Sequence, residues 1–356
     1  MILNPAEIIW AEPIVAIHPD PEWEREVKAR LGMVTDVLRR VSPSPWVRRV
    51  VMEWEVPPMT HITGHLAAKL SMVVGQENAC RYCYGATRAA MRVLGHSERY
   101  ITEMERSVQL AELDEREYAL IQFARNLARS NPRPSHADRE RLIAMGYPPE
   151  MSIEAAVYVA SSCFYNRVAT FVSAQPVLKF ERLAYSWMIR IIGPMLARKL
   201  LLRATPKVSP KPASGQFAKL ISTLGGLPFA PVLNDSLEAA FSPSLLSQPL
   251  KLLMFGVVSR LLDCGYCQSE CRSLSLSHGM SAGEFNAGLD SLRPERLSPE
   301  EQRILAWTRE TVRYDTPQIQ RLTRELGEAI GPEKLVEAIG LASLANAVVR
   351  LAMVLE

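Results

Sequence analysis

Cys80-Arg-Tyr-Cys83 recurs further along the chain as Cys264-Gly-Tyr-Cys267, and this repeated pair of cysteines decides the fold that we expect. The two motifs are 184 positions apart, and in each a tyrosine precedes the second cysteine. A fixed offset between matching segments is the signature of an internal repeat. The motifs therefore predict two copies of one structural unit, with a dithiol in each copy.

Several further segments match at nearly the same offset. At 184 positions these are Gly95 with Gly279, 113–117 with 297–301, and 123–125 with 307–309. At 183 positions, 154–155 matches 337–338 and 167–169 matches 350–352. We therefore predict tandem homologous domains, with a first domain at 1–180, a connecting segment at 181–215 and a second domain at 216–356.

Apolar residues recur at helical spacing through most of the chain, whereas alternating strand patterns are absent. Gly95 and Gly279 are expected to end helices, as glycine commonly does. The predicted fold class is all-α, with one helical bundle in each half and the two bundles packed as an internal pseudo-dimer. The expected helices are 22–40, 46–55, 61–75, 80–94, 114–128, 135–145, 153–172, 250–262, 264–277, 299–312, 317–330 and 334–355.

The composition is that of a soluble globular protein with room for two domains, because 48% of the 356 residues are apolar and 22% are charged. A net charge of +3 is too small to favour nucleic acid as a partner. Residues 1–20 lack the pattern of a signal peptide, and no run of eighteen uncharged apolar residues predicts a membrane span. With six cysteines and no export signal, we expect reduced thiols in the cytoplasm.

The segment between the halves has two parts. Residues 183–203 combine apolar side chains with arginine and lysine, which favours a helix packed on the first domain. The alternative for 183–203 is a helix that lies on an anionic membrane surface. Residues 204–215 contain three prolines with serine and lysine, a composition typical of an extended linker.

A Cys-x-x-Cys pair at the start of a helix favours redox chemistry. Unpaired backbone N–H groups and the positive end of the helix dipole stabilise a thiolate there, and so lower the pKa of the thiol. The second cysteine lies one turn away and can close a disulfide with the first. The alternatives are buried, inert cysteines, or one structural zinc ion bound by both pairs.

The sequence around each motif resembles the alkylhydroperoxidase and carboxymuconolactone decarboxylase superfamily. The resemblance is carried by Ser71-Met-Val-Val-Gly-Gln-Glu-Asn-Ala-Cys-Arg-Tyr-Cys-Tyr-Gly-Ala86 and by Phe255-Gly-Val-Val-Ser-Arg-Leu-Leu-Asp-Cys-Gly-Tyr-Cys267. It extends over roughly 34–172 and 217–356. It implies an all-helical fold that commonly forms homo-oligomers.

The resemblance also implies a role for each cysteine of the two motifs. Cys83 and Cys267 would face a hydroperoxide or another small oxidant, and Cys80 and Cys264 would be their resolving partners. The oxidised pairs would be reduced again by a dithiol protein, of the lipoyl or thioredoxin-like kind. The leading hypothesis is therefore a thiol-dependent, peroxidase-like oxidoreductase with antioxidant activity.

The chain departs from the pattern of the peroxidase branch at two positions in each half. That branch has a glutamate twelve residues before the first cysteine and a histidine four residues after the second, and together they relay protons. The glutamate is replaced by Ala68 and Leu252, and the histidine by Thr87 and Cys271. Since general acid–base groups are missing, turnover is expected to be impaired.

Two substitutes for the missing relay are considered. His65 is three residues before Ala68 and shares its helical face, so it could approach the region of Thr87. Cys271 continues the spacing of Cys264 and Cys267 on one helical face, where three thiols could relay a disulfide or bind a soft metal.

Two alternatives to the peroxidase-like hypothesis stay open. One is an inactive duplicated scaffold or a thiolate metal-binding protein. The other is lactone decarboxylation, for which no acid–base constellation is recognised. Cofactor motifs are absent from the sequence, so no bound cofactor is expected. Cys163 falls in an apolar helix and is expected in the core, whereas Arg88 is expected on an exposed face.

Overall fold

The computed structural model describes residues 11–106, 113–176 and 215–356, together with positions 184, 186, 189, 193 and 195. Within these residues the regular elements are helices and no strand occurs, so the predicted all-α fold class is confirmed. The predictions for 183–203 and for 204–215 lie outside the described residues, apart from those five positions and Gly215. The domain bounds therefore stay a prediction.

The helices of the first half are α1 (Pro21–Leu31), α2 (Asp36–Arg40), α3 (Pro45–Glu55), α4 (Gly64–Glu77), α5 (Arg81–Val93), α6 (Glu98–Arg106), α7 (Glu115–Arg129), α8 (His136–Ala144) and α9 (Pro149–Phe171). Those of the second half are α12 (Ala218–Thr223), α13 (Ala230–Phe241), α14 (Gln248–Leu261), α15 (Gly265–Ser277), α16 (Ala282–Ser291), α17 (Pro299–Glu310), α18 (Thr316–Ile330) and α19 (Pro332–Leu355).

The helices of the two halves correspond in order and in bounds. Helices α4 and α14 begin and end 184 positions apart, and so do α5 and α15. Helices α9 and α19 begin 183 positions apart. Thr63 and Ser247, which cap α4 and α14, also occupy matching positions. This correspondence supports the predicted duplication of one helical unit.

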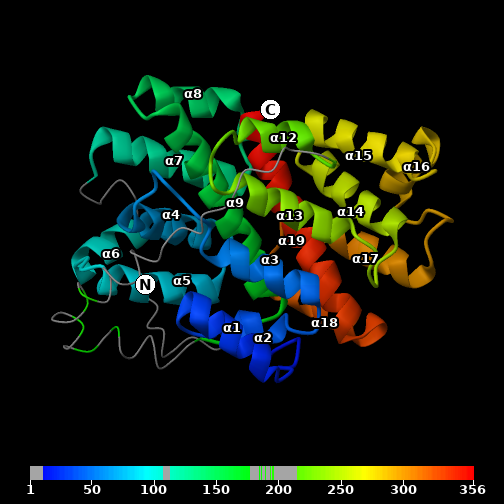
Figure 1. Ribbon diagram of the computed structural model, residues 1–356, viewed down its shortest axis with the longest axis horizontal. Coiled ribbons are helices and arrows are strands. Elements are labelled where there is room, and N and C mark those ends of the chain that lie inside the picture. Colours follow the sequence, from blue (N-terminus) through cyan, green and yellow to red (C-terminus); the bar gives the residue numbers. More distant parts are fainter. Residues whose placement is uncertain are drawn as a thin grey trace.

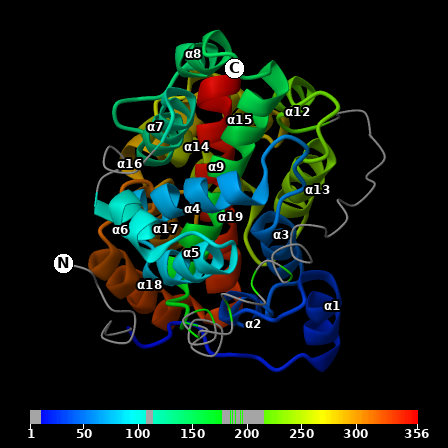
Figure 2. The same ribbon diagram turned by 90° about the vertical axis from the view of Figure 1, so that its left-hand side faces the viewer.

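The long helices α9 and α19 form the centre of the molecule and pack against each other (Figure 1). In Figure 1, helices α4 to α8 lie on the left of this pair and α14 to α17 on the right, while α3 lies across the centre and contacts α9, α13 and α19. Seen from the side, α4 and α5 cover α9 (Figure 2). Helix α19 is long and apolar enough to cross a membrane, but its most apolar window is entirely buried inside the protein, as in a core helix.

Two buried arginines join the halves through reciprocal hydrogen bonds. Arg167 on α9 donates from Nε to the carbonyl oxygen of Thr311 at 3.2 Å, and Arg350 on α19 donates from Nε to that of Ala128 at 3.3 Å. Both the donors and the acceptors are 183 positions apart. Reciprocal contacts of this kind are what a two-fold related pair of units makes, so the halves pack as the predicted pseudo-dimer.

A second reciprocal pair of contacts lies beside the two dithiol motifs. Ala79 and Asp263 each precede the first cysteine of a motif, and both have positive φ angles, of 47° and 53°. The hydroxyl of Thr316, from the second half, donates to the carbonyl of Ala79 at 3.2 Å. Arg133, from the first half, donates to the carboxylate of Asp263 at 2.6 Å. Each half therefore helps to hold the turn that leads into the other half's dithiol.

Candidate active site

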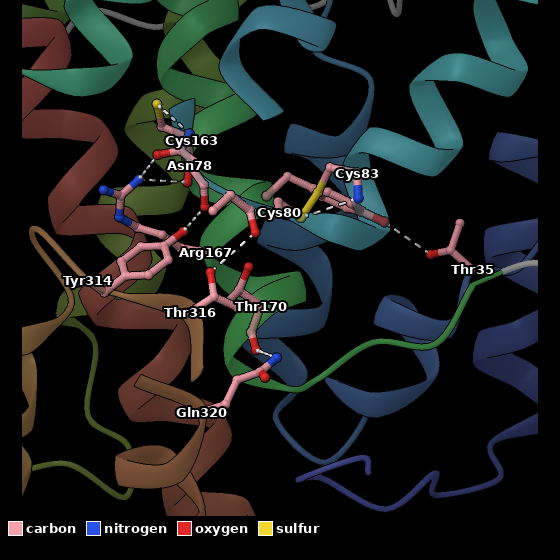
Figure 3. Close-up of a disulfide and its surroundings, with 12 residues drawn as sticks. Thr35, Asn78, Cys80, Cys83, Cys163, Arg167, Thr170, Tyr314, Thr316 and Gln320 are labelled. Atoms are coloured by element: carbon pink, nitrogen blue, oxygen red, sulfur yellow. Dashed lines mark hydrogen bonds between the residues drawn. A yellow bond between two sulfur atoms is a disulfide. The ribbon is translucent and has the colours of Figure 1, made fainter. Parts of the chain in front are cut away.

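Each dithiol motif begins a helix, and its first cysteine is the N-cap residue. The Sγ of Cys80 accepts a hydrogen bond from the backbone N–H of Cys83 at 3.2 Å, and Cys264 accepts from Cys267 at 3.4 Å. Cys80 and Cys83 form a disulfide, which Figure 3 shows at the junction of the two halves. Both sulfur pairs therefore lie at the positive end of a helix dipole.

The Cys83 side of the disulfide faces a cavity of about 190 Å³ inside the first half. Side chains from α3, α4, α5 and α9 form its wall together with the turn before α2. Cys83 itself is buried, with 8% of its surface exposed, so the cavity is what gives a small molecule access to it. The lining residues are Met33, Thr35, Trp54, Glu55, Pro57, Ser71, Tyr82, Cys83, Ala86, Thr87, Tyr158, Ser161, Ser162, Tyr165 and Asn166.

Three polar atoms of this wall are buried without a hydrogen-bond partner in the protein. They are Glu55 Oε2, Ser161 Oγ and Asn166 Nδ2. Nearly all buried polar groups in proteins are hydrogen-bonded, and exceptions call for a ligand or a functional reason. Three such atoms around one cavity leave hydrogen-bonding capacity for a polar molecule there, water included.

Glu55 is the carboxylate of the cavity wall and the last residue of α3. Its pKa is raised from 4.5 to about 7, because burial disfavours the charged form, and a hydrogen bond from Tyr165 opposes this only in part. A carboxyl with such a pKa can accept or donate a proton near neutral pH.

Hydroxyl groups of tyrosine, serine and threonine line the same cavity as this carboxylate. The hydroxyl of Thr35 lies 3.3 Å from that of Tyr165, and the hydroxyl of Ser71 lies 2.8 Å from that of Tyr158. Burial raises the pKa of Tyr165 well above its usual value and raises that of Tyr158 as well. The phenols therefore stay protonated and can donate hydrogen bonds to a bound molecule.

Cys80 faces a different cavity, of about 300 Å³, which lies between the two halves. The end of α9 forms one wall and the start of α18 the other. Gln320 on α18 bridges them, because its Nε2 donates to the carbonyl of Thr170 at 3.1 Å (Figure 3). The lining residues are Ala11, Cys80, Arg81, Tyr82, Ala169, Thr170, Ser173, Ala174, Thr316, Pro317 and Gln320. The two sulfurs of one disulfide thus face two separate cavities.

In the second half, Cys267 is more deeply buried than its counterpart Cys83. Cys264 is 3% exposed and Cys267 has no exposed surface, while their sulfurs lie 2.9 Å apart. The hydrogen bond from the Cys267 thiol lowers the pKa of Cys264, whereas burial raises that of Cys267 well above its usual value. The resemblance assigned the peroxide-facing role to Cys267, whereas the directions of these two pKa shifts favour ionisation of Cys264 over Cys267.

Six polar positions of the first-half cavity are apolar in the second half. Phe255, which matches Ser71, packs between Phe217 and Phe241 with ring centroids 5.7 and 5.1 Å apart. The space beside Cys267 is therefore occupied by core side chains. The other matching pairs are Glu55 with Ala239, Tyr158 with Leu341, Ser161 with Leu344, Tyr165 with Val348 and Asn166 with Val349.

The sequence-based candidates divide into those at the cavity and those outside it. Thr87 lines the cavity together with Cys83. His65 is exposed and is not among the lining residues; its Nδ1 lies 3.3 Å from Nε2 of His96. Burial lowers the pKa of His96 to about 4, so His96 is neutral at neutral pH.

The third thiol of the second half is fully buried in the core. Cys271 lies 3.9 Å from the hydroxyl of Ser259, and burial raises its pKa to about 12. Within the described part of the chain, no group of three or more histidine, cysteine, aspartate or glutamate side chains is arranged to hold a metal ion. Cys163 is buried, as expected, and accepts a hydrogen bond from Asn78 at 3.4 Å.

The expectation that Arg88 is exposed was wrong. Its side chain is buried and forms ion pairs with Glu98 and Glu105. Those partners lie on α6, which the sequence-based prediction did not include among the helices. Glu77, at the end of α4, pairs with Arg125 and Arg129 and belongs to neither cavity.

Sequence reasoning missed Glu55 and the polar residues of α9. A signal was present, because Ser71, Tyr158 and Tyr165 have apolar counterparts at the repeat offset. A position that is polar in one half and apolar in the other indicates that the side chain has a different environment in the two halves.

Comparisons with known proteins return no family model that matches the chain. No curated protein matches it either. Among solved structures, an uncharacterized peroxidase-related protein from Silicibacter sp. TM1040 is 21% identical over 48% of this chain and 94% of its own, with a TM-score of 0.41. An uncharacterized peroxidase-related protein from Ralstonia eutropha JMP134, described as an alkylhydroperoxidase AhpD core, is 20% identical over 52% of this chain and 98% of its own, also with a TM-score of 0.41.

Proposed function

We propose that the first half is a dithiol oxidoreductase that reduces a small, uncharged hydroperoxide, with Cys83 as the attacking thiol and Cys80 as the resolving thiol. The observation that carries this proposal is the polar cavity at Cys83, with three unpartnered buried polar atoms in its wall. The resolving sulfur lies within bonding distance on the same helix start.

The reaction uses both thiols. The Cys83 thiolate attacks the terminal oxygen of the hydroperoxide, so that an S–O bond forms, the O–O bond breaks and the alcohol leaves after it gains a proton. Cys83 is then a sulfenic acid. The thiol of Cys80 attacks the oxidised sulfur, the disulfide forms and water leaves, while the peroxide has been reduced by two electrons.

The charge of the cavity limits the class of substrate. Its described lining contains the carboxylate of Glu55 and no lysine, arginine or histidine. An anionic hydroperoxide would lose solvation there without gaining a cation as partner. The hydroxyls of Ser161, Tyr158 and Tyr165 suit the neutral O–OH group, so uncharged substrates are preferred over carboxylates. The same argument disfavours lactone decarboxylation of a carboxylated substrate.

The cavity at Cys80 supports a separate route for the reductant. A thiolate that enters between the halves attacks Cys80, so the Cys80–Cys83 bond breaks and Cys83 leaves as the thiolate. The second thiol of a dithiol reductant then attacks the mixed disulfide and releases Cys80, and the reductant leaves as a disulfide. A lipoyl group or a thioredoxin-like protein has the required chemistry.

The second half is proposed to be a scaffold in this chain. Cys267 has no exposed surface, and Phe255, which takes the place of Ser71, packs in an apolar cluster with Phe217. It still supplies Thr316 and Gln320 to the wall of the Cys80 cavity. The hypothesis of an inactive scaffold thus applies to one half, and the redox hypothesis to the other.

The test measures consumption of tert-butyl hydroperoxide by the reduced full-length protein together with the loss of free thiols. The expected result is stoichiometric consumption that Cys83→Ser abolishes and the matched variant Cys267→Ser leaves unchanged. If Cys83→Ser consumes peroxide as the unaltered protein does, the proposal is wrong. A carboxylated hydroperoxide of similar size is expected to react more slowly.

A further inference from the structure

We infer that Glu55 is the proton-transfer residue of the first-half cavity, where it takes the place of the glutamate and histidine that the chain lacks. This inference depends on the proposed function, because it names the group that carries a proton between Cys83 and the leaving oxygen. Three features of the structure support it.

The first feature is position. Glu55 ends α3 and reaches the same cavity as Cys83 and Thr87, which come from α5. Helix α3 and helix α5 both pack against α9. A substrate or a water molecule in the cavity can therefore contact the carboxylate and the sulfur from the two sides.

The second feature is that one carboxylate oxygen is buried and unpartnered. Oε2 of Glu55 has no hydrogen-bond partner in the protein, and the one side chain that hydrogen-bonds to the carboxyl group is Tyr165. A structural carboxylate that is partly buried is normally paired with a cation or with backbone N–H groups. Glu154 shows this ordinary arrangement, since it accepts three backbone N–H bonds from 60–62. Glu55 has no such role.

The third feature is the set of titratable groups that face Glu55. These are Tyr82 and Cys83 on α5 and Tyr158 and Tyr165 on α9, and the carboxyl of Glu55 is the one acid among the described lining residues. The nearest further carboxylate that acts on Tyr82, Asp36, is paired with Arg40. The phenols hold their protons, so the proton that moves near neutral pH belongs to Glu55 or to Cys83.

Glu55 takes up one proton and returns it during the step. The ionised carboxylate of Glu55 accepts the proton of the Cys83 thiol, and the thiolate attacks the terminal oxygen of the hydroperoxide. The O–O bond breaks, and the leaving alkoxide takes the proton from Glu55 and departs as an alcohol. Glu55 is ionised again, Cys83 is a sulfenic acid, and no proton is gained or lost overall.

The experiment compares variants of the reduced, full-length protein by the rate of tert-butyl hydroperoxide consumption from about pH 5 to about pH 9. The rate of the unaltered protein is expected to rise with an inflection near the pKa of Glu55, about 7, because Glu55 must be ionised to accept the thiol proton. Glu55→Gln should lower the rate about 100-fold and remove that inflection.

Two further variants separate proton transfer from a structural effect. Glu53→Gln, on the same helix but paired with Arg30 at the surface, should leave the rate and the inflection unchanged. Tyr165→Phe removes the hydrogen bond that favours ionised Glu55, so it should move the inflection to higher pH. A structural role for Glu55 predicts no such movement.

The outcomes distinguish this inference from the proposed function. If Cys83→Ser is inactive while Glu55→Gln keeps both its rate and its inflection, the role of Glu55 is refuted and the dithiol activity stands. If Cys83→Ser stays active, the proposed function itself fails. If Glu55→Gln does not fold, an unmoved inflection in Tyr165→Phe refutes the inference.

Discussion

Replacing Glu55 by glutamine should stabilise the protein at alkaline pH and have little effect at acidic pH. The glutamine keeps the size and the neutral form of the protonated side chain. In the folded protein the pKa of Glu55 is about 7, compared with 4.5 for a solvated glutamate. Folding therefore favours the protonated carboxyl, and the ionised carboxylate opposes folding.

The size of this effect follows from the two pKa values. A tenfold change in proton affinity corresponds to about 1.36 kcal/mol, so the rise from 4.5 to about 7 corresponds to about 3 kcal/mol. The full stability is present below pH 4.5 and is lost as the pH rises through 7. Glu55→Gln should therefore gain up to about 3 kcal/mol over the unaltered protein above pH 7, and almost nothing below pH 4.5.

Urea unfolding of the oxidised protein at several pH values measures this difference, since the disulfide keeps Cys83 from titrating. The control is Glu53→Gln, whose exposed ion pair with Arg30 should contribute no more than about 1 kcal/mol at any pH. A gap between Glu55→Gln and the unaltered protein that stays constant with pH would contradict the burial of this carboxylate.

Four other experiments, three substitutions and one labelling measurement, test the packing described above. Ser71→Phe copies the residue of the second half and should fill the cavity, so peroxide consumption should fall to the level of Cys83→Ser while circular dichroism stays unchanged. After reduction, iodoacetamide should label Cys83 before Cys267 and Cys271, which have no exposed surface; equal labelling by mass spectrometry would argue against the sealed second half. Arg167→Ala removes the hydrogen bonds from this side chain to the carbonyls of Thr311 and Val312, of which Val312 keeps its bond from Arg350, and should cost about 3 kcal/mol in urea unfolding. A loss below about 1 kcal/mol would show that this contact is unimportant. Gly340→Ala would place a Cβ 2.6 Å from Cγ2 of Val47 and should lower stability by about 1–3 kcal/mol, with an unchanged melting temperature as the contrary result.

Local patterns in the sequence were enough to predict the all-helical fold and the motifs at helix starts. Helix propensity, caps such as Thr63 and the cysteine spacing depend on neighbours within a few residues. The repeat offset then gave the correspondence of the two halves. Thr87 was identified because its position relative to Cys83 is fixed by one helix.

The rest of the candidate site depends on contacts between distant segments. Glu55 is functional in our proposal because Tyr82 and Tyr165, far along the chain, surround its carboxylate. Arg88 is buried because α6 brings Glu98 and Glu105 against it. Neither effect can be inferred from spacing along one helix, since packing between helices decides it. His65 shows the same point, because it contacts His96 and does not line the cavity at Cys83.

The reciprocal bonds of Arg167 and Arg350 have a consequence for the freedom of the two halves to differ. In a dimer of identical chains, an exchange of Ser71 for phenylalanine would close both cavities at once. Here the two halves are encoded separately, so a residue can change in one half alone, while the hydrogen bonds of Arg167 and Arg350 still join the two halves. One half can thus lose its redox activity and still supply, in every molecule, the residues that line the Cys80 cavity of the other half.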